Sequence, residues 1–154
     1  MINKIDNEIV LKLQKYKYRD SIRKLSKPFD FINFMILIAF LRISNIITHK
    51  EFKKFITGMI LLFFLKNYFK RKRPFKANNK IKNRDKSKLD YYSFPSGHSF
   101  STFLLATILY RKYKNLNLFF IPLLVGFSRI YLGVHYPSDI LFGYIFAYLF
   151  EMLY

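Results

Sequence analysis

Five apolar stretches, separated by short polar segments, dominate the 154-residue chain. A bilayer core of about 30 Å takes about 20 helical residues. Two of the stretches reach this length easily, and three lie at or near the lower limit. The pattern predicts an all-α integral membrane helical bundle with about five transmembrane helices, the third and fifth of them short. The alternative is a soluble all-α core, but one domain cannot bury five such segments: 29–48, 52–69, 97–110, 116–134 and 140–154.

The first 27 residues have a different pattern, in which apolar side chains recur at helical spacing among eight bases and three acids. This predicts a basic amphipathic N-terminal helix over residues 1–27, followed by a membrane-embedded domain over residues 28–154. Such a helix tends to lie in the headgroup plane of a bilayer. The alternative is a solvated helix that packs on the rest of the chain. The apolar positions are Ile2, Ile5, Ile9, Leu13 and Tyr16.

Composition adds a strong positive charge, because 27 Lys and Arg residues face only 9 Asp and Glu residues. Ten of these bases lie in residues 70–88, which have no apolar run and are predicted to form a loop. Attraction to anionic headgroups, about 1 kcal/mol per base near the surface, explains this charge without a nucleic-acid partner. The chain has no Cys, which excludes disulfides and Cys-ligated metal sites. Nothing in the sequence defines an oligomeric state.

Polar residues at the ends of the predicted spans are candidate functional groups, because burying them in a bilayer is costly. If the spans alternate in direction, the end of the second, the start of the third, the end of the fourth and the start of the fifth share one side. Arg contacts phosphate oxygens with a planar fork, and a helix N-terminus binds anions. The group therefore predicts a phosphate site made of Lys66, Arg73, Ser96, Gly97, His98, Arg129, His135 and Asp139.

The two histidines can divide the chemistry. A neutral imidazole attacks phosphorus when a carboxylate holds its other nitrogen, and His135 with Asp139 offers this pair across the turn before the fifth span. His98 has no acid nearby in the sequence, and its ordinary pKa of about 6.5 would let it protonate the leaving alkoxide. A nucleophile, an orienting carboxylate and a separate acid then complete the chemistry without a metal or other cofactor.

These residues fall into three blocks that resemble the signature of the type 2 phosphatidic acid phosphatase and vanadium haloperoxidase superfamily. The blocks are Lys66-x6-Arg73-Pro74, Pro95-Ser96-Gly97-His98 and Ser128-Arg129-x5-His135-x3-Asp139. By this resemblance Lys66, Arg73, Ser96, Gly97 and Arg129 bind phosphate, His98 is the acid, His135 the nucleophile and Asp139 its orienter. It implies hydrolysis without metal, with a lipid phosphate or diphosphate as substrate. The run from Tyr92 to His98 is similar to the polyisoprenoid diphosphate phosphatase branch.

The charges predict which side of the membrane carries the site. With two spans before the first block, residues 1–27 and 70–88 lie on the catalytic side and contribute eighteen bases. The opposite loops contribute six, so the positive-inside rule predicts a cytoplasmic catalytic face. This prediction depends on the N-terminal helix not crossing the bilayer, because a crossing at residues 5–24 would reverse the balance.

Three functional classes agree with parts of the sequence. A multi-pass lipid phosphatase explains both the predicted spans and the histidines. A vanadate-dependent haloperoxidase would use the same anion site, but its known members look soluble and much larger. A non-catalytic basic membrane protein would explain the charge but not the placement of His98, His135 and Asp139.

Overall fold

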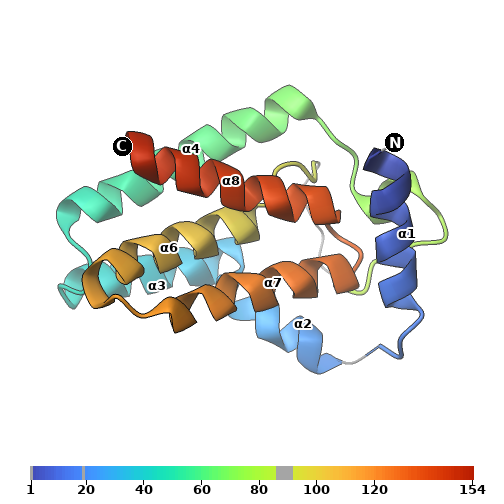
Figure 1. Ribbon diagram of the computed structural model, residues 1–154, viewed down its shortest axis with the longest axis horizontal. Helices are drawn as coiled ribbons and strands as arrows, with labels where there is room; N and C mark the ends of the chain where they lie inside the picture. The colour runs from blue at the N-terminus through green and yellow to red at the C-terminus, as the bar shows by residue number, and fades with distance from the viewer. Residues whose placement is uncertain (1, 19, 86–91) are drawn as a thin grey trace.

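The computed structural model describes residues 2–18, 20–85 and 92–154, and every regular element within these ranges is a helix (Figure 1). The predicted all-α class is therefore confirmed. The elements are α1 (Ile2–Gln14), α2 (Asp20–Ser26), η1 (Lys27–Phe29), α3 (Phe31–Ile43), α4 (His49–Phe69), α5 (Pro74–Ala77), α6 (Gly97–Tyr113), η2 (Leu116–Phe119), α7 (Phe120–Tyr131) and α8 (Pro137–Leu153).

The longer helices begin at residues whose side chains satisfy free backbone N–H groups. Thr48 and Glu51 form a reciprocal pair at the start of α4, in which each side chain accepts a hydrogen bond from the other residue's backbone. Ser96 accepts from the Ser99 amide at the start of α6. Pro137 occupies the first position of α8, where a missing N–H costs nothing. Two of these starts, at α6 and α8, lie at the site described below.

Helix α6 lies at the centre of the bundle, in contact with α4, α7 and α8. Its inner face buries Phe100, Leu104 and Ile108 against residues of α3, α4 and α8. The approach of α8 is close because a Cβ on Gly143 would lie 3.0 Å from both the Ser96 carbonyl oxygen and the Ser99 Cβ. A side chain at this position would push α8 away from the start of α6, where the predicted phosphate-binding residues lie.

The N-terminal residues form two helices instead of the single amphipathic helix that the sequence predicted. Helix α1 ends at Gln14 and α2 begins at Asp20, so the chain turns between them. Helix α1 packs against α7 and α8, and Val10 is buried with Ile81 and Tyr136. Figure 1 shows α1 across one end of the bundle, with the C-terminus at the other end. Of the two predicted placements, the structure agrees with packing on the rest of the chain.

The helices are shorter than several of the apolar stretches that predicted them. Helix α3 has 13 residues and α7 has 12, since η2 takes up the start of the fourth stretch. Within the described residues, no helix combines the length and the apolar character that a membrane crossing needs. The number of spans therefore stays a prediction.

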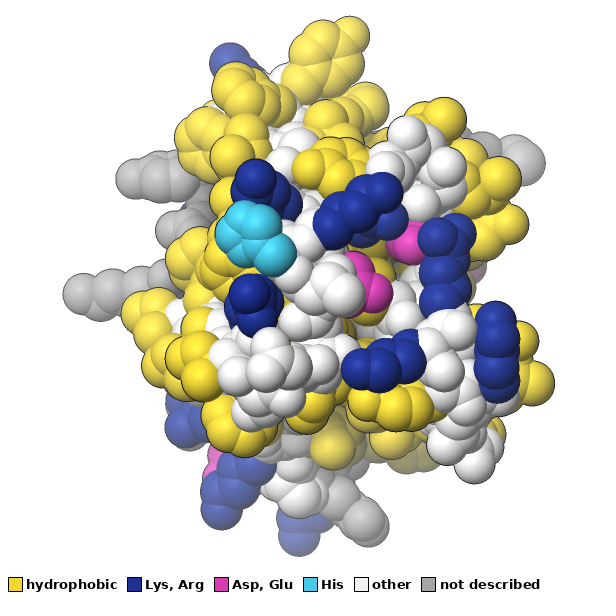
Figure 2. All heavy atoms as spheres, turned by 90° about the vertical axis from the view of Figure 1, so that its left-hand side faces the viewer, with side chains coloured by type: hydrophobic (Ala, Val, Ile, Leu, Met, Phe, Trp, Pro, Cys, Tyr) yellow, Lys and Arg dark blue, Asp and Glu magenta, His cyan; other side chains and the backbone are white. Residues whose placement is uncertain are grey.

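The end of the bundle opposite α1 carries a buried ion pair. Lys54 Nζ lies 3.1 Å from Glu151 Oε1, and both side chains are almost fully buried. Glu151 also pairs with Arg111, which is largely exposed. Figure 2 shows this end of the molecule, where basic side chains surround a few acidic ones. The pair joins the start of α4 to the end of α8.

Replacing Glu151 with Ala should destabilise the fold by about 3–5 kcal/mol, because it leaves Lys54 as a buried charge without its carboxylate. The double variant Lys54→Met/Glu151→Leu removes both charges and should lose much less. Denaturant unfolding of the purified proteins measures both free energies. Equal losses in the single and double variants would mean that the charge of Lys54 needs no compensation.

Candidate active site

A tight turn after α7 positions His135. Helix α7 ends at Tyr131, and Gly133 adopts a φ of 75°, a left-handed conformation that Gly reaches at little cost. The amides of Val134 and His135 then both donate to the Arg129 carbonyl, at 3.2 and 3.3 Å. The turn folds the chain back over the end of α7 and buries the His135 side chain just before α8 begins.

The structure places Asp139 beside His135. Asp139 is the third residue of α8, and its Oδ2 atom accepts a hydrogen bond of 2.9 Å from the Tyr136 amide. The same oxygen lies 3.5 Å from His135 Nδ1. This distance is longer than an ordinary hydrogen bond, but such contacts often shorten when substrate binds. The first turn of α8 thus fixes the carboxylate on the Nδ1 side of the ring.

Arg73 faces the other ring nitrogen of His135. Its Nη1 atom lies 3.2 Å from His135 Nε2 and donates to the Val134 carbonyl at 3.0 Å. A guanidinium has only donors, so Nε2 must present its lone pair to Arg73. The proton of the neutral ring then sits on Nδ1, toward Asp139. In this tautomer Nε2 is the nucleophilic nitrogen, and it points at a cation that binds phosphate well.

Burial and nearby cations keep this imidazole neutral. Burial is the largest cause that holds the pKa of His135 well below its ordinary value, and the positive charges of Arg73 and Lys66 lower it further. A protonated ring has no lone pair on Nε2, so a low pKa favours nucleophilic attack near pH 7.

Burial acts in the opposite direction on the carboxylate. It raises the pKa of the Asp139 carboxyl above its ordinary value, and the Arg71 guanidinium opposes this rise. Arg71 Nη1 lies 2.7 Å from Asp139 Oδ1, on the side of the carboxylate away from the oxygen near His135. Arg71 therefore favours the ionised carboxylate that can accept a hydrogen bond from Nδ1.

Lys66, Ser96 and Gly97 come together where α4 meets the start of α6. A Cβ on Gly97 would lie 3.2 Å from Leu62 and 3.9 Å from the Lys66 Cε, so the two helices approach closely here. Lys66 Nζ donates to the Tyr92 carbonyl at 3.4 Å. The Ser96 amide donates to the Asp139 carbonyl at 3.0 Å, which ties α6 to α8. The structure thus brings these three residues to the same end of the bundle as His135.

Arg129 and His98 have carboxylate partners that the sequence analysis did not assign. Arg129 Nη2 lies 3.3 Å from Asp85 Oδ2, and its Nη1 contacts Ser26. His98 Nε2 lies 3.0 Å from Asp30 Oδ1, at the start of α3. Both Arg129 and His98 still act electrostatically on His135. They therefore belong to the same end of the bundle, where each is paired with an acidic side chain.

Two further residues of this end were missed by the sequence analysis, namely Arg71 and Asp6. Arg71 lies inside the first signature block at a position that the block leaves undefined, among other bases. Asp6 lies in α1, 65 residues away in the chain, and pairs with Arg71 at 2.7 Å. The available signal in the sequence was spacing: Asp6 lies four residues before Val10 and so shares its face of the helix. In the structure both side chains are buried.

Comparison with known proteins agrees with this geometry. Residues 34–154 match the PAP2 superfamily. The chain belongs to the PAP2 superfamily. Its fold is similar to that of LpxE from Aquifex aeolicus, with a TM-score of 0.78 and 24% identity over 97% of this chain and 93% of that one. It is also similar to a PAP2 type phosphatidylglycerolphosphate phosphatase from Bacillus subtilis, with a TM-score of 0.78 and 22% identity over 99% and 83% of the two chains.

The superfamily resemblance predicted from the three signature blocks is thus confirmed. The PAP2 match begins within α3, whereas α1 and α2 lie before it. Among the described residues, no three His, Asp or Glu side chains are arranged to hold a metal ion. The roles of the individual site residues, and the metal-free chemistry, stay predictions for this PAP2 chain.

The geometry predicts that His135 becomes protonated only at a pH below about 6.5, and that the neutral ring carries its proton on Nδ1. Burial and adjacent cations disfavour the charged ring, so its protonation should occur at a lower pH than the value of about 6.5 for an ordinary His. A ¹⁵N NMR titration of histidine-labelled protein measures both properties, and His135→Gln assigns the signal. Protonation above pH 6.5, or a proton on Nε2, would contradict the geometry.

Proposed function

We propose that this PAP2 chain is a membrane-bound lipid phosphatase that hydrolyses a phosphomonoester or phosphoanhydride through a phosphohistidine at His135. The observation that carries the proposal is the setting of the imidazole, with Nε2 facing Arg73 and Nδ1 facing Asp139. The similar Bacillus subtilis protein is a phosphatidylglycerolphosphate phosphatase by name, which supports a lipid phosphate as the class of substrate.

The substrate phosphate binds between the cations at this end of the bundle. Arg73 turns from Nε2 to a phosphate oxygen, and Lys66 lies close enough to act on the same group. Arg129 exchanges the Asp85 carboxylate for a second phosphate oxygen. The first turn of α6, after Ser96 and Gly97, directs backbone N–H groups at the anion. These contacts neutralise the phosphate and place phosphorus near Nε2.

The reaction then proceeds in two displacements. His135 Nε2 forms a bond to phosphorus as the bond to the leaving oxygen breaks, and His98 supplies the proton that makes the leaving group an alcohol or a phosphate. Asp139 accepts a hydrogen bond from Nδ1–H and stabilises the positive charge on the ring. A water molecule next attacks phosphorus, His98 takes its proton, and the P–N bond breaks to release inorganic phosphate and neutral His135.

Asp30 gives His98 a partner in this scheme. The carboxylate contacts Nε2 of His98 at 3.0 Å from the N-terminal end of α3. A carboxylate at this distance holds the imidazole ring in a fixed orientation. The acid that the sequence did not place near His98 therefore comes from a different helix.

Exposed apolar side chains support a membrane location. Monomeric soluble proteins rarely expose large contiguous apolar patches. On α3, α4, α7 and α8 many large apolar side chains are about half exposed or more, and a bilayer would cover them. Examples are Phe31, Ile32, Ile36, Phe40, Phe63, Phe64, Phe120, Leu123, Leu141 and Leu149. A lipid substrate could then enter from the bilayer with its phosphate at the polar end of the bundle.

Packing of α1 also supports a cytoplasmic catalytic face. Asp6 contacts Arg71 and Ser138, so the N-terminal segment lies at the same end as the site. This arrangement favours the charge balance in which residues 1–27 and 70–88 lie on one side with eighteen bases. The positive-inside rule then places that side in the cytoplasm.

Phosphate release from a panel of lipid phosphates tests the function. The purified protein in detergent should hydrolyse at least one of phosphatidate, phosphatidylglycerolphosphate or an isoprenyl diphosphate, and EDTA should not stop it. His135→Ala should abolish turnover, and Asp139→Asn should slow it by orders of magnitude through loss of the acceptor for Nδ1–H. His49→Ala, at an exposed position of α4, is the matched control. Activity that needs added Mg²⁺, or that survives in His135→Ala, would refute the mechanism.

Cysteine labelling tests the orientation in this cysteine-free chain. A cysteine at the exposed Asn79, between α5 and α6, should react with a membrane-impermeant maleimide only after the cells are permeabilised. A cysteine at the exposed Asn117, in η2 near the opposite end, should react in intact cells. The reversed labelling pattern would place the catalytic face outside.

A further inference from the structure

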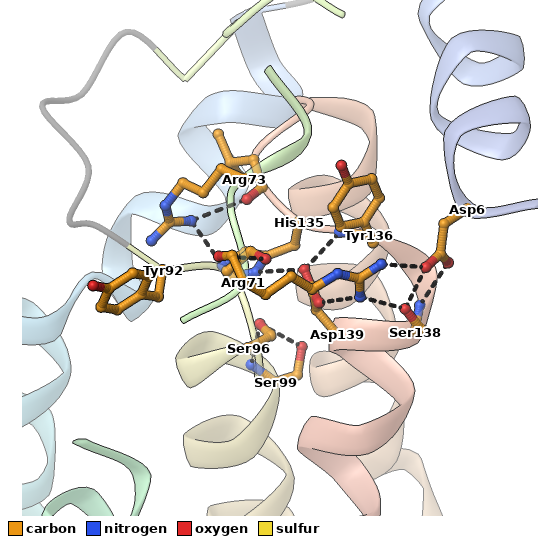
Figure 3. A network of polar contacts seen from close by, with 12 residues as sticks. Asp6, Arg71, Arg73, Tyr92, Ser96, Ser99, His135, Tyr136, Ser138 and Asp139 are labelled. Atoms are coloured by element: carbon orange, nitrogen blue, oxygen red, sulfur yellow. Dashed lines mark hydrogen bonds and ion pairs between the residues drawn. The ribbon is translucent and has the colours of Figure 1, made fainter. Parts of the chain in front are cut away.

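Arg71 joins three segments of the chain at the candidate site. Its Nη1 atom donates to Asp139 Oδ1 and to Ser138 Oγ, both at 2.7 Å, and its Nη2 atom lies 2.7 Å from Asp6 Oδ2. The guanidinium also stacks over the Tyr136 ring, 4.1 Å from its centre. Figure 3 shows the Arg71 guanidinium between Asp139 on one side and Asp6 with Ser138 on the other. These contacts fix the guanidinium in position and orientation.

Asp6 ties α1 to the start of α8. Its Oδ1 accepts a hydrogen bond of 3.1 Å from the Ser138 amide, and its Oδ2 contacts Ser138 Oγ. Ser138 is the second residue of α8, where the backbone N–H has no partner within the helix. A carboxylate from a different helix therefore caps α8, and its negative charge suits the positive end of the helix dipole.

We propose that Asp6 and Arg71 form a clamp through which helix α1 positions Asp139, and with it the His135 nucleophile. The clamp rests on the proposed function in one respect, the assignment of His135 as the nucleophile. Arg71 is then a positioning residue, distinct from the phosphate-binding cations. It acts on the oxygen of Asp139 that does not face His135.

The electrostatics of the buried carboxylate support this role. Burial raises the pKa of Asp139, and Arg71 is the strongest of the groups that oppose the rise. Without Arg71, the Asp139 carboxylate would lose the cation that lies 2.7 Å from its Oδ1 atom, which disfavours its ionised form. A protonated Asp139 would no longer be a full acceptor for Nδ1–H. The charged and titratable groups that face this network are Asp6, Lys66, Arg73, His135 and Tyr136.

The clamp reaches outside the part of the chain that matches the superfamily. Residues 34–154 contain Arg71, Ser138 and Asp139, whereas Asp6 lies before them. The superfamily pattern therefore specifies the nucleophile and its orienter, and α1 adds a support that the pattern does not describe.

The first experiment measures the protonation of Asp139 directly. In protein labelled with ¹³C at aspartate, the side-chain carboxyl signal of Asp139 is assigned with Asp139→Asn and followed against pH. Arg71→Gln should move its protonation upward by about 1–3 pH units, because an adjacent Arg lowers the pKa of an Asp by that amount. Arg71→Lys should keep most of the effect of the charge. Lys72→Gln, which removes a neighbouring exposed base of the same loop, should leave the protonation unchanged.

The second experiment measures the docking of α1 by amide hydrogen exchange. Both Asp6→Asn and Arg71→Gln should speed exchange in residues 2–14, because each removes one side of the clamp. Lys72→Gln should not. Exchange in the other helices serves as the control for folding, because a variant that fails to fold would exchange rapidly throughout the chain. Unchanged exchange in both clamp variants would overturn the coupling between α1 and the site.

The third experiment separates positioning from phosphate binding. Arg71→Gln should lower kcat at pH 7 by about tenfold or more and move the acid limb of kcat/KM to higher pH, since each pKa unit changes the ionised fraction tenfold. Its KM and its inhibition by vanadate, a mimic of the phosphoryl-transfer state, should stay nearly constant. A higher KM with weaker vanadate inhibition and an unmoved acid limb would make Arg71 a phosphate ligand and overturn the proposal.

The first two measurements need no turnover, so the clamp and the proposed function can fail separately. If the Asp139 titration and the α1 exchange change as expected but no lipid phosphate is hydrolysed, the clamp stands and the function is wrong. If hydrolysis depends on His135 but Asp139 titrates alike with and without Arg71, the function stands and the clamp is wrong.

Discussion

The buried carboxylate of Asp139 is the group on which the catalytic end of the molecule depends. Taking a charge out of water costs several kcal/mol unless other groups compensate it. Here its two oxygens engage Arg71 and the Tyr136 amide, and its own backbone carbonyl accepts from the Ser96 amide. One residue thereby connects the start of α8 to the start of α6 and to the loop after α4. The position of His135 follows from these connections, because its ring must fit between Asp139 and Arg73.

The groups that shape the helix ends are also the groups expected to carry the chemistry. Ser96 caps α6 and precedes the backbone expected to bind phosphate, and Asp139 satisfies the first turn of α8 while it faces the imidazole. Gly143 has no side chain and so lets α8 approach α6 at this level. Two helix starts therefore meet at one place, and an anion there gains from both. The hydrogen bonds that satisfy the free N–H groups at the two helix starts therefore also hold the site residues in place.

Sequence analysis predicted the helical class, the superfamily and the residues that gather near His135, because apolar stretches and fixed motif spacings are local properties. It did not predict the break between α1 and α2, because apolar side chains keep their helical spacing as far as Tyr16, beyond the end of α1. It also did not predict the shortness of α3 and α7, since turns and 3₁₀ segments also occur within apolar runs. It also missed Asp6, Asp30 and Asp85. Each of these acids meets its partner across a large separation in the chain, and an isolated acid has no periodicity that could reveal such a contact.

The contact between Asp6 and Ser138 joins residues 132 positions apart. Closing so long a loop costs conformational entropy before any contact compensates for it, so contacts of this kind form late in folding. During synthesis, α1 leaves the ribosome long before α8 exists, so Asp6 can meet Ser138 only after α8 has been made. The contacts that hold Asp139 beside His135 are therefore complete only when α1 and α8 meet. Until then, the emerging protein carries the cations expected to bind phosphate, but not yet in the arrangement that the folded chain gives them.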